Sequence, residues 1–337
     1  MSAKRGTMLL ALLLCAALCA GCAPVGVNPM LEAVATVVPG TDPVLPEAQE
    51  DGSAALQTHQ QATLYFRFLD EPLLAPESRT ITQAPSQSYE MALLGELLSG
   101  PGTHSADLNG LFPEGTRVLS TVKQGRTLFV TLSDEIMNGY SDEPNAWRDG
   151  GVWQTEVPLR RVLCMQSLVA TVTENCDVDQ VQVLVQQDQA AVGSLRLKQR
   201  YFMDGSDDSV LVGPMTRNDA LLLTPDTTLR VLLDCWQSQD WQRMYRYLAL
   251  RDPSTGAERA PERDFVTAME QLSRLTGADF TGGSLSASGT CMTYTLSAHL
   301  MDGTGSEWDV SDRVVRLYRE GDRWKTTLEQ LTGWLEE

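Results

Sequence analysis

The chain of 337 residues carries 44 acidic and 26 basic side chains, which gives a formal net charge of -18 at pH 7. Nucleic acids are disfavoured as partners of such a chain, because affinity for them comes mainly from neutralising phosphates. An anionic lipid surface would also repel the folded part, so any attachment to a membrane has to be hydrophobic. With 42% hydrophobic residues, the chain is long enough to bury the cores of two domains.

The N-terminal residues have the order of a secretory signal peptide. Lys4 and Arg5 precede an unbroken apolar stretch of 11 residues at 8–18, and small residues follow up to position 21. A helix that spans a bilayer needs about 20 apolar residues. The shorter stretch therefore predicts an export signal over residues 1–21 and not a permanent transmembrane helix.

Cys22 stands directly after this signal. The triplet Ala20-Gly21-Cys22 resembles the bacterial lipobox, in which the cysteine receives a diacylglycerol and the chain is cut before it. Cys19 takes the position where that motif usually has leucine, and an ordinary signal peptide with a chance cysteine is the alternative. Because two or more acyl chains anchor a protein stably, the resemblance implies a palmitate-bearing lipoprotein, extracytoplasmic and lipid-anchored to the cell membrane of a bacterium.

Residues 22–59 are predicted to form a disordered tether. Residues 23–59 contain five prolines and no aromatic residue, and no Lys or Arg occurs from Gly6 to Phe66. Such a segment cannot bury enough apolar area to offset the entropy of ordering it. As a flexible coil it would have an end-to-end distance of roughly 35 Å, so it would hold the folded part near the membrane.

The first folded part is predicted over residues 60–218 and begins with a strand. Leu64, Phe66 and Phe68 alternate with more polar residues, which is the period of a half-buried strand. Residues 73–81 look like its partner.

A helix follows, with Ser86 or Ser88 as its cap and Gly100-Pro101 as its stop. Residues at i+4 steps from Tyr89 to Leu97 give this helix one apolar face.

Residues 116–122 and 126–132 are predicted to form a hairpin. A second helix over residues 157–174 has Pro158 near its first position. An alternating strand at residues 179–187 comes next. Its expected buried residues are Val181, Val183 and Val185.

The stretches LLAPESR, LLSGP, LFPEGTRVLSTV and RTLFVTLSDE make residues 60–218 similar to the GerMN domain, a sporulation and spore-germination module of bacterial envelope lipoproteins. The second helix and the strand after it continue the resemblance, and residues 214–217 look like its closing segment. The resemblance implies a compact α+β fold related to ring-building modules of envelope assemblies, without known chemistry.

A long loop at residues 137–155 departs from the GerMN pattern and contains Trp147 and Trp153. Tryptophan is enriched among the residues that anchor interfaces, so both side chains are candidates for an interface with a partner. The alternative is that they pack over the edge of the domain.

A second α+β domain is predicted over residues 224–335. Thr224 caps its first helix, and Pro225 takes the first helical position. The apolar stripe of that helix consists of Leu229, Leu232, Leu233 and Trp236. A further helix is predicted over residues 261–277. The expected antiparallel strands lie at residues 291–301, 309–318 and 323–331.

The stretches CWQSQDWQRMYRYL and LYREGDRWKTTLE resemble the cone-shaped nuclear-transport-factor-2-like fold. The likeness is greatest to the non-catalytic domain that precedes the transpeptidase in some penicillin-binding proteins. The whole chain is thus expected to have two small α+β domains after a signal peptide and a tether.

No constellation for catalysis or metal binding stands out. The three histidines lack metal-ligand spacing, and no phosphate-binding glycine motif appears. Ser120 and Lys123 have the SxxK spacing of penicillin-binding nucleophiles, but on a strand these positions point to opposite faces. Asp234, Tyr245 and Tyr294 are of the residue types that serve catalysis in cone folds, although packing and solvation explain them as well.

Four cysteines follow the anchor: Cys164, Cys176, Cys235 and Cys291. Export permits disulfides without requiring them, and buried thiols are the favoured interpretation. Cys235 with Cys291 is the more plausible disulfide, because that helix is expected to pack on that sheet.

These predictions describe a non-catalytic, lipid-anchored cell-envelope protein that acts as a binding or assembly module in sporulation, germination or cell-wall-proximal complexes. No cofactor or metal is expected. The expected partners are the membrane, through the N-terminal lipid, and an envelope protein, while self-association stays open. The alternatives are a regulatory or sensor lipoprotein that partners a membrane signalling protein, and a small-ligand binder that uses the cone-domain pocket.

Overall fold

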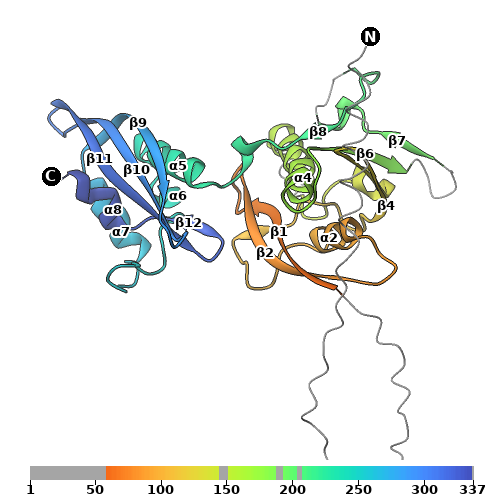
Figure 1. The fold of residues 1–337 in the computed structure, drawn as a ribbon. Helices are drawn as coiled ribbons and strands as arrows, with labels where there is room; N and C mark the ends of the chain where they lie inside the picture. The colour runs from red at the N-terminus through yellow and green to blue at the C-terminus, as the bar shows by residue number, and fades with distance from the viewer. Residues whose placement is uncertain (1–57, 144–150, 187–192, 203–206, 336–337) are drawn as a thin grey trace, which may run out of the picture. The chain divides into compact units, whose positions relative to one another are not determined.

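The computed structural model describes residues 58–143, 151–186, 193–202 and 207–335 (Figure 1). The predicted signal peptide and nearly all of the predicted tether lie outside the described residues. Strand β1 begins at Thr58, within the last two residues assigned to the tether, because Thr58 and His59 pair with Gln83 and Thr82 of the next strand. Within the described ranges, no helix has the length and apolar content needed to cross a membrane.

The first sheet has the strand order β2-β1-β3. Its strands are β1 (Thr58–Phe68), β2 (Leu74–Gln83) and β3 (Leu108–Asn109). The predicted pairing of the first two is confirmed, and the pair is antiparallel. The prediction that β1 is half-buried is wrong, because Tyr65 and Arg67 are buried as well as the apolar residues between them.

Helix α4 (Trp153–Asn175) explains this double burial. It packs on β1, where the Ser167 hydroxyl donates to the Tyr65 carbonyl at 2.6 Å and the Thr171 hydroxyl accepts from the Tyr65 N–H at 3.1 Å. Hydroxyls on the helix therefore bind backbone groups of β1 that would otherwise be buried without partners. The helix begins four residues before its predicted start, and Pro158 lies inside it, where its missing N–H costs one bond near the helix start.

Helix α2 (Tyr89–Leu98) follows the predicted pattern. Of the two candidate caps, Ser88 is the one used, and its hydroxyl accepts from the Met91 N–H at 3.2 Å. Leu93 and Leu97 are buried. Gly100 adopts a φ of 88° just after the helix, a conformation that favours glycine and ends the helix.

The second sheet has the strand order β4-β5-β6-β7, and β8 also pairs with β6. Its strands are β4 (Val118–Gln124), β5 (Thr127–Leu132), β6 (Gln180–Gln186), β7 (Ser194–Arg196) and β8 (Met215–Thr216). The predicted β4–β5 hairpin is confirmed, and β5 and β6 run parallel, joined through α4. The predicted burial of Val181, Val183 and Val185 is confirmed too. Three short 3₁₀ helices accompany the sheet: Asp134–Met137, Gln199–Tyr201 and Asp219–Leu221.

The C-terminal part begins with α5 (Pro225–Ser238), capped by Thr224 as predicted. All four residues of the expected apolar stripe are buried. Gln239 adopts a φ of 60° and ends the helix, and Asp240 then caps α6 (Trp241–Tyr245). Helix α7 (Glu262–Glu270) is shorter than predicted, because residues 274–277 belong to a strand.

A four-stranded antiparallel sheet of order β12-β11-β10-β9 completes this part. Its strands are β9 (Arg274–Leu285), β10 (Cys291–Met301), β11 (Glu307–Glu320) and β12 (Arg323–Lys325), followed by α8 (Leu328–Thr332) and the 3₁₀ helix Gly333–Leu335. Strand β9 was not predicted. The strand predicted at 323–331 is wrong beyond Lys325, because Thr327 caps α8. Both halves are α+β, as the sequence predicts.

The edge of β2 that does not pair with β1 forms hydrogen bonds with residues from the C-terminal half. The Leu74 carbonyl accepts from the Leu223 N–H at 2.7 Å, and the Ser78 N–H donates to the Asp322 carboxylate at 2.8 Å. Between them, the Arg323 guanidinium donates to the carbonyl of Pro76. These bonds satisfy backbone groups that an edge strand would otherwise expose.

An ion pair with a buried carboxylate lies beside this edge. The Glu71 side chain is only 4% exposed and binds the Arg243 guanidinium, with Oε2 and Nη2 2.6 Å apart. Phe68 packs on Tyr247 with 5.4 Å between ring centroids, and the Lys325 ammonium lies 5.2 Å from the Phe68 centroid. We call this set of contacts the β2 junction.

Candidate partner-binding groove

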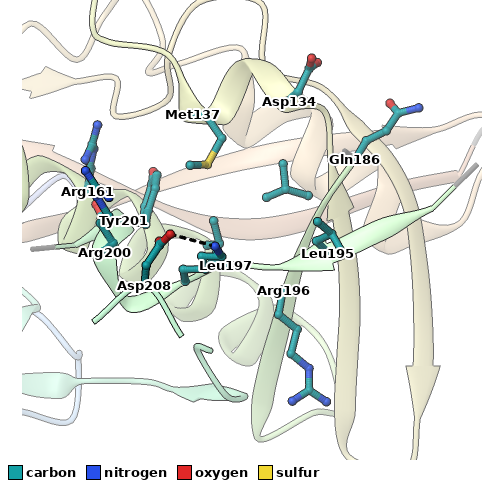
Figure 2. A pocket seen from close by; sticks show the side chains of 12 residues that line it. Asp134, Met137, Arg161, Gln186, Leu195, Arg196, Leu197, Arg200, Tyr201 and Asp208 are labelled. Carbon is teal, nitrogen blue, oxygen red and sulfur yellow. Dashed lines mark hydrogen bonds and ion pairs between the residues drawn. The ribbon is translucent and has the colours of Figure 1, made fainter. Parts of the chain in front are cut away.

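A hollow of about 610 Å³ lies beside edge strand β7 (Figure 2). We call it the β7 groove. It is lined by Asp134, Met137, Arg161, Val185, Gln186, Leu195, Arg196, Leu197, Lys198, Arg200, Tyr201 and Asp208. Helix α4, strands β6 and β7 and two 3₁₀ helices contribute these residues, so regular elements position most of the lining.

Aliphatic side chains form much of the lining. Leu195 is 53% exposed and Met137 is 49% exposed, whereas Val185 and Leu197 are buried beneath them. In Figure 2, Met137 and Leu195 lie on two sides of the hollow. Leu211, which bridges to Lys198 in antiparallel fashion, adds a further side chain that is 52% exposed. Large aliphatic groups gathered in one exposed place are typical of interaction sites.

The lining of the β7 groove also contains four cationic side chains and two carboxylates. Lys198 pairs with Asp208 at 3.1 Å, and the Arg161 guanidinium donates to the Tyr201 carbonyl at 2.9 Å. Arg196 and Arg200 form no ion pair with any residue that the structure describes. On a chain with a net charge of -18, the groove is therefore a local site of positive charge that favours anionic groups.

Two side chains at the base of the groove that could act as nucleophiles, Tyr201 and Cys164, are buried. Tyr201 is 3% exposed, and burial raises the pKa of its hydroxyl well above its ordinary value. Cys164 lies fully buried beside it, and burial raises the pKa of its thiol as well. Both groups are therefore protonated at neutral pH, and the arrangement suits binding better than covalent chemistry.

A second hollow, of about 440 Å³, adjoins the β7 groove through Arg161, which lines both. Trp153, Val157 and Arg161 share a face of α4, because they are spaced at i, i+4 and i+8. Trp153 is half-buried and lies in the helix, not in the loop where it was predicted. Trp147 lies outside the described residues. The role of the two tryptophans at an interface stays a prediction.

Other residues singled out in the sequence do not form a site together. Ser120 and Lys123 lie on exposed strand β4. The Tyr245 hydroxyl donates to the carbonyl of Ala260 at 2.8 Å, whereas buried Tyr294 binds the Asp226 carboxylate and not Asp234. Among the described residues, no three His, Cys, Asp or Glu side chains gather as metal ligands would.

All four cysteines after the anchor are free thiols, with Cys164 and Cys235 buried and Cys176 and Cys291 half-buried. The disulfide considered between Cys235 and Cys291 does not form. Helix α5 packs mainly on β9.

Sequence reasoning missed the β7 groove. A signal was present in the stretch SLRLKQRY at residues 194–201, where Arg196, Lys198 and Arg200 recur at every second position in an acidic chain. The stretch was overlooked because strand β7 is only three residues long. The rest of the groove comes from residues far away in the sequence.

Comparison with known proteins gives a family for part of the chain. Residues 63–190 match the family described as "Germane: Sporulation and spore germination". A search of curated proteins found no match.

Among solved structures, the tandem GerMN domains of the sporulation protein GerM from Bacillus subtilis match at 18% identity and a TM-score of 0.30, over 48% of this chain and 45% of that one. The chain thus spans less than half of that tandem structure. A putative lipoprotein from Clostridium perfringens matches at 20% identity and a TM-score of 0.26, over 48% of this chain and 89% of that one. A Δ5-3-ketosteroid isomerase from Mycobacterium sp. matches at 13% identity and a TM-score of 0.23, over 30% and 89%. The match to the Germane family, at residues 63–190, lies inside the span for which the sequence predicts a GerMN domain.

Proposed function

We propose that the chain is a non-catalytic, lipid-anchored cell-envelope protein that binds a partner protein through the β7 groove. The protein would act in sporulation, in germination or in complexes near the cell wall. One observation supports the proposal most. Leu195, which is 53% exposed, lies in the same groove as Arg196 and Arg200, and these two arginines lack ion-pair partners among the described residues. Arginine is enriched at protein interfaces, and exposed apolar groups gathered in one place are typical of interaction sites.

The Germane match supports the setting of this proposal. The family that residues 63–190 match is described by sporulation and spore germination. The lipid anchor rests on Cys22 and the apolar stretch before it. A tether between lipid and fold would raise the local concentration of the groove near a membrane partner without adding any contact.

Two variants test the groove. Leu195→Glu places a carboxylate where an apolar contact is expected, and Leu285→Glu makes the same change at a side chain that is 54% exposed on β9. Full-length wild type and both variants would be purified from solubilised membranes, and co-purifying proteins identified by mass spectrometry. We expect one partner to be lost at least tenfold with Leu195→Glu and retained with Leu285→Glu. Equal retention in both variants would refute the groove as the binding site.

The anchor is tested separately by Cys22→Ser. Wild type is expected to partition into the detergent phase, and the variant into the aqueous phase or to keep its signal uncut, because the acyl chains carry the membrane affinity. Identical partitioning of the two proteins would refute lipidation at Cys22.

A further inference from the structure

The β7 groove follows the outer edge of strand β7. Residues 195–198, which are consecutive in the chain, all line the hollow. Successive side chains of a strand point to opposite faces of its sheet, and in Figure 2 the side chains of Leu195 and Arg196 extend to opposite sides of β7. A hollow over one face alone would be lined by every second residue. The groove therefore lies along the backbone of β7 and is open to both faces of the sheet.

The backbone of Leu195 faces this groove with its hydrogen-bonding groups free. Beyond β7, the Leu197 carbonyl accepts from the Val212 N–H at 2.8 Å. The Gln199 N–H donates to the Val210 carbonyl, also at 2.8 Å. Because peptide groups alternate in direction along a strand, the N–H and C=O of Leu195 point the same way as those of Leu197, away from β6. Within the described ranges, neither group of Leu195 has a hydrogen-bond partner.

The chain covers the edge of β7 only in part. Leu211 bridges to Lys198 in antiparallel fashion, so residues 210–212 lie along the edge just after β7 ends. From Val212 the chain continues to β8, which pairs with β6 and not with β7. The edge at residues 194–196 thus stays open among the residues that the structure describes. An open edge is a template on which an extended segment can add one more strand.

We propose that the partner binds by adding a strand to this edge, antiparallel to β7. The inference rests on the proposed function, since it takes the groove as the binding site and states how the partner is recognised there. The antiparallel direction is the one in which residues 210–212 already pair with the same edge. Hydrogen bonds to Leu195 then supply affinity, and the side chains beside it supply specificity.

The side chains of the edge define the chemistry of the added strand. Residues directly opposite each other in an antiparallel pair share a face of the sheet. Leu195 is 53% exposed and its register partner on β6 is the buried Val185, so the residue opposite Leu195 is apolar. Arg196 extends to the other face, and Lys198 and Arg200 also line the groove. The neighbours of the apolar residue are therefore acidic.

The same edge of a second copy is a poor occupant. Arg196 and Lys198 of one copy would face the same cations of the other, and like charges opposite each other destabilise a pair of strands. An acidic segment without an apolar residue would leave Leu195 uncovered. The structure thus favours a partner that offers an extended segment in which acidic residues flank an apolar one.

Synthetic peptides test this mode of recognition. The probe is a fluorescein-labelled peptide of sequence SEEVEES with blocked ends, in which glutamates flank a single valine. Two derivatives carry one N-methyl group each, either on the valine or on the glutamate that follows it. In an antiparallel pair, the residue opposite Leu195 directs its N–H towards β7, whereas the next residue directs its N–H away. The two derivatives therefore differ only in which backbone donor is removed.

The full-length protein in detergent would be titrated into each peptide, and the fluorescence anisotropy measured. We expect the probe and the N-methylglutamate peptide to have dissociation constants within about twofold of each other, and the N-methylvaline peptide to bind at least about tenfold more weakly. Leu195→Glu should weaken binding of the probe at least about tenfold. Leu285→Glu, which changes a side chain that is 54% exposed on β9, should leave it unchanged.

A charge exchange tests the acidic part of the proposal. Arg196→Glu should bind the probe at least about tenfold more weakly and should bind the peptide SKKVKKS more tightly than the wild type does. Arg263→Glu is the matched control, because the Arg263 side chain is 93% exposed on α7. This variant should keep the affinity of the wild type for both peptides.

Equal weakening by the two N-methyl groups, or no weakening by either, would overturn strand addition. A probe that fails to bind the wild type would overturn the proposal as well, and so would unchanged binding in Arg196→Glu. Partner capture from membranes with Leu195→Glu decides separately about the proposed function. If the partner is lost in that variant while the peptide results fail, the groove stays the binding site and only the mode of recognition falls.

Discussion

The β2 junction and the β7 groove show two ways of treating the edge of a sheet. At β2, backbone groups and arginines find partners inside the chain: Arg243 binds Glu71, and Arg323 binds Asp107 at 3.1 Å. At β7, Arg196 and Arg200 find none among the described residues, and aliphatic side chains remain exposed. An arginine therefore indicates binding to another molecule only where the fold itself provides no carboxylate for it.

The largest effect is expected at the centre of the β2 junction. Phe68 is fully buried against Tyr247 and Lys325, so Phe68→Ala should lower the free energy of unfolding by about 3–4 kcal/mol. Urea denaturation followed by circular dichroism measures this loss. A loss below about 1 kcal/mol would mean that the junction is not a core, and the comparison of the two edges would fail.

The buried ion pair of the junction should come next. Glu71→Gln removes a charge that is 4% exposed and leaves Arg243, 32% exposed, without its carboxylate. We expect a loss of about 2 kcal/mol, less than for a pair buried on both sides. A double-mutant cycle with Arg243→Met should show a coupling energy of at least about 1 kcal/mol. For the exposed pair of Arg263 and Asp264, the same cycle should give about zero.

A smaller effect is expected from Lys325, which is buried and donates to the Arg246 carbonyl at 2.6 Å. Burial lowers the pKa of Lys325 from 10.5 to about 8. Between these two values the unfolded chain binds more protons than the folded one, so stability rises with pH. Relative to Lys325→Met, the free energy of unfolding of the wild type should rise by about 1 kcal/mol from about pH 8 to about pH 9. A flat difference over this interval would show that the ammonium is not desolvated in the junction.

The smallest effect on stability is expected in the β7 groove. Leu195→Ser should change the free energy of unfolding by less than about 0.5 kcal/mol, because more than half of this side chain is already in water. Its effect should appear in partner capture instead. A loss above about 2 kcal/mol in urea denaturation would make Leu195 a core residue and remove the difference between the two edges.

Local signals in the sequence predicted local structure well. Thr224 and Pro225 fixed the start of α5, and the alternating valines identified β6, because caps and periodicity depend on neighbouring residues. The prediction of β1 as half-buried failed because its second face is covered by α4, about a hundred residues away. Strand β9 was missed because glycines and polar residues dominate residues 274–285, and pairing with β10 outweighs their low strand propensity.

The candidate site was harder to predict than the fold. In the β7 groove, residues 134–137 and 161 lie together with residues 185–201. A periodic pattern of side chains within one segment does not predict a contact between distant segments. Trp147 and Trp153 were predicted at an interface only because tryptophan is enriched among the residues that anchor interfaces. Only Trp153 can be placed, on the face of α4 that leads to Arg161 and the groove.

The β7 groove is proposed as the partner-binding surface, whereas exposed apolar side chains elsewhere on the protein are expected to have no such role. Site-specific photo-cross-linking in living cells tests it most directly, with the photoreactive residue placed at position 195 or at position 285, two leucines that are 53% and 54% exposed. We expect a heavier adduct with one partner, identified by mass spectrometry, at position 195 and none at position 285. The same adduct at both positions, or an adduct at position 285 alone, would contradict it.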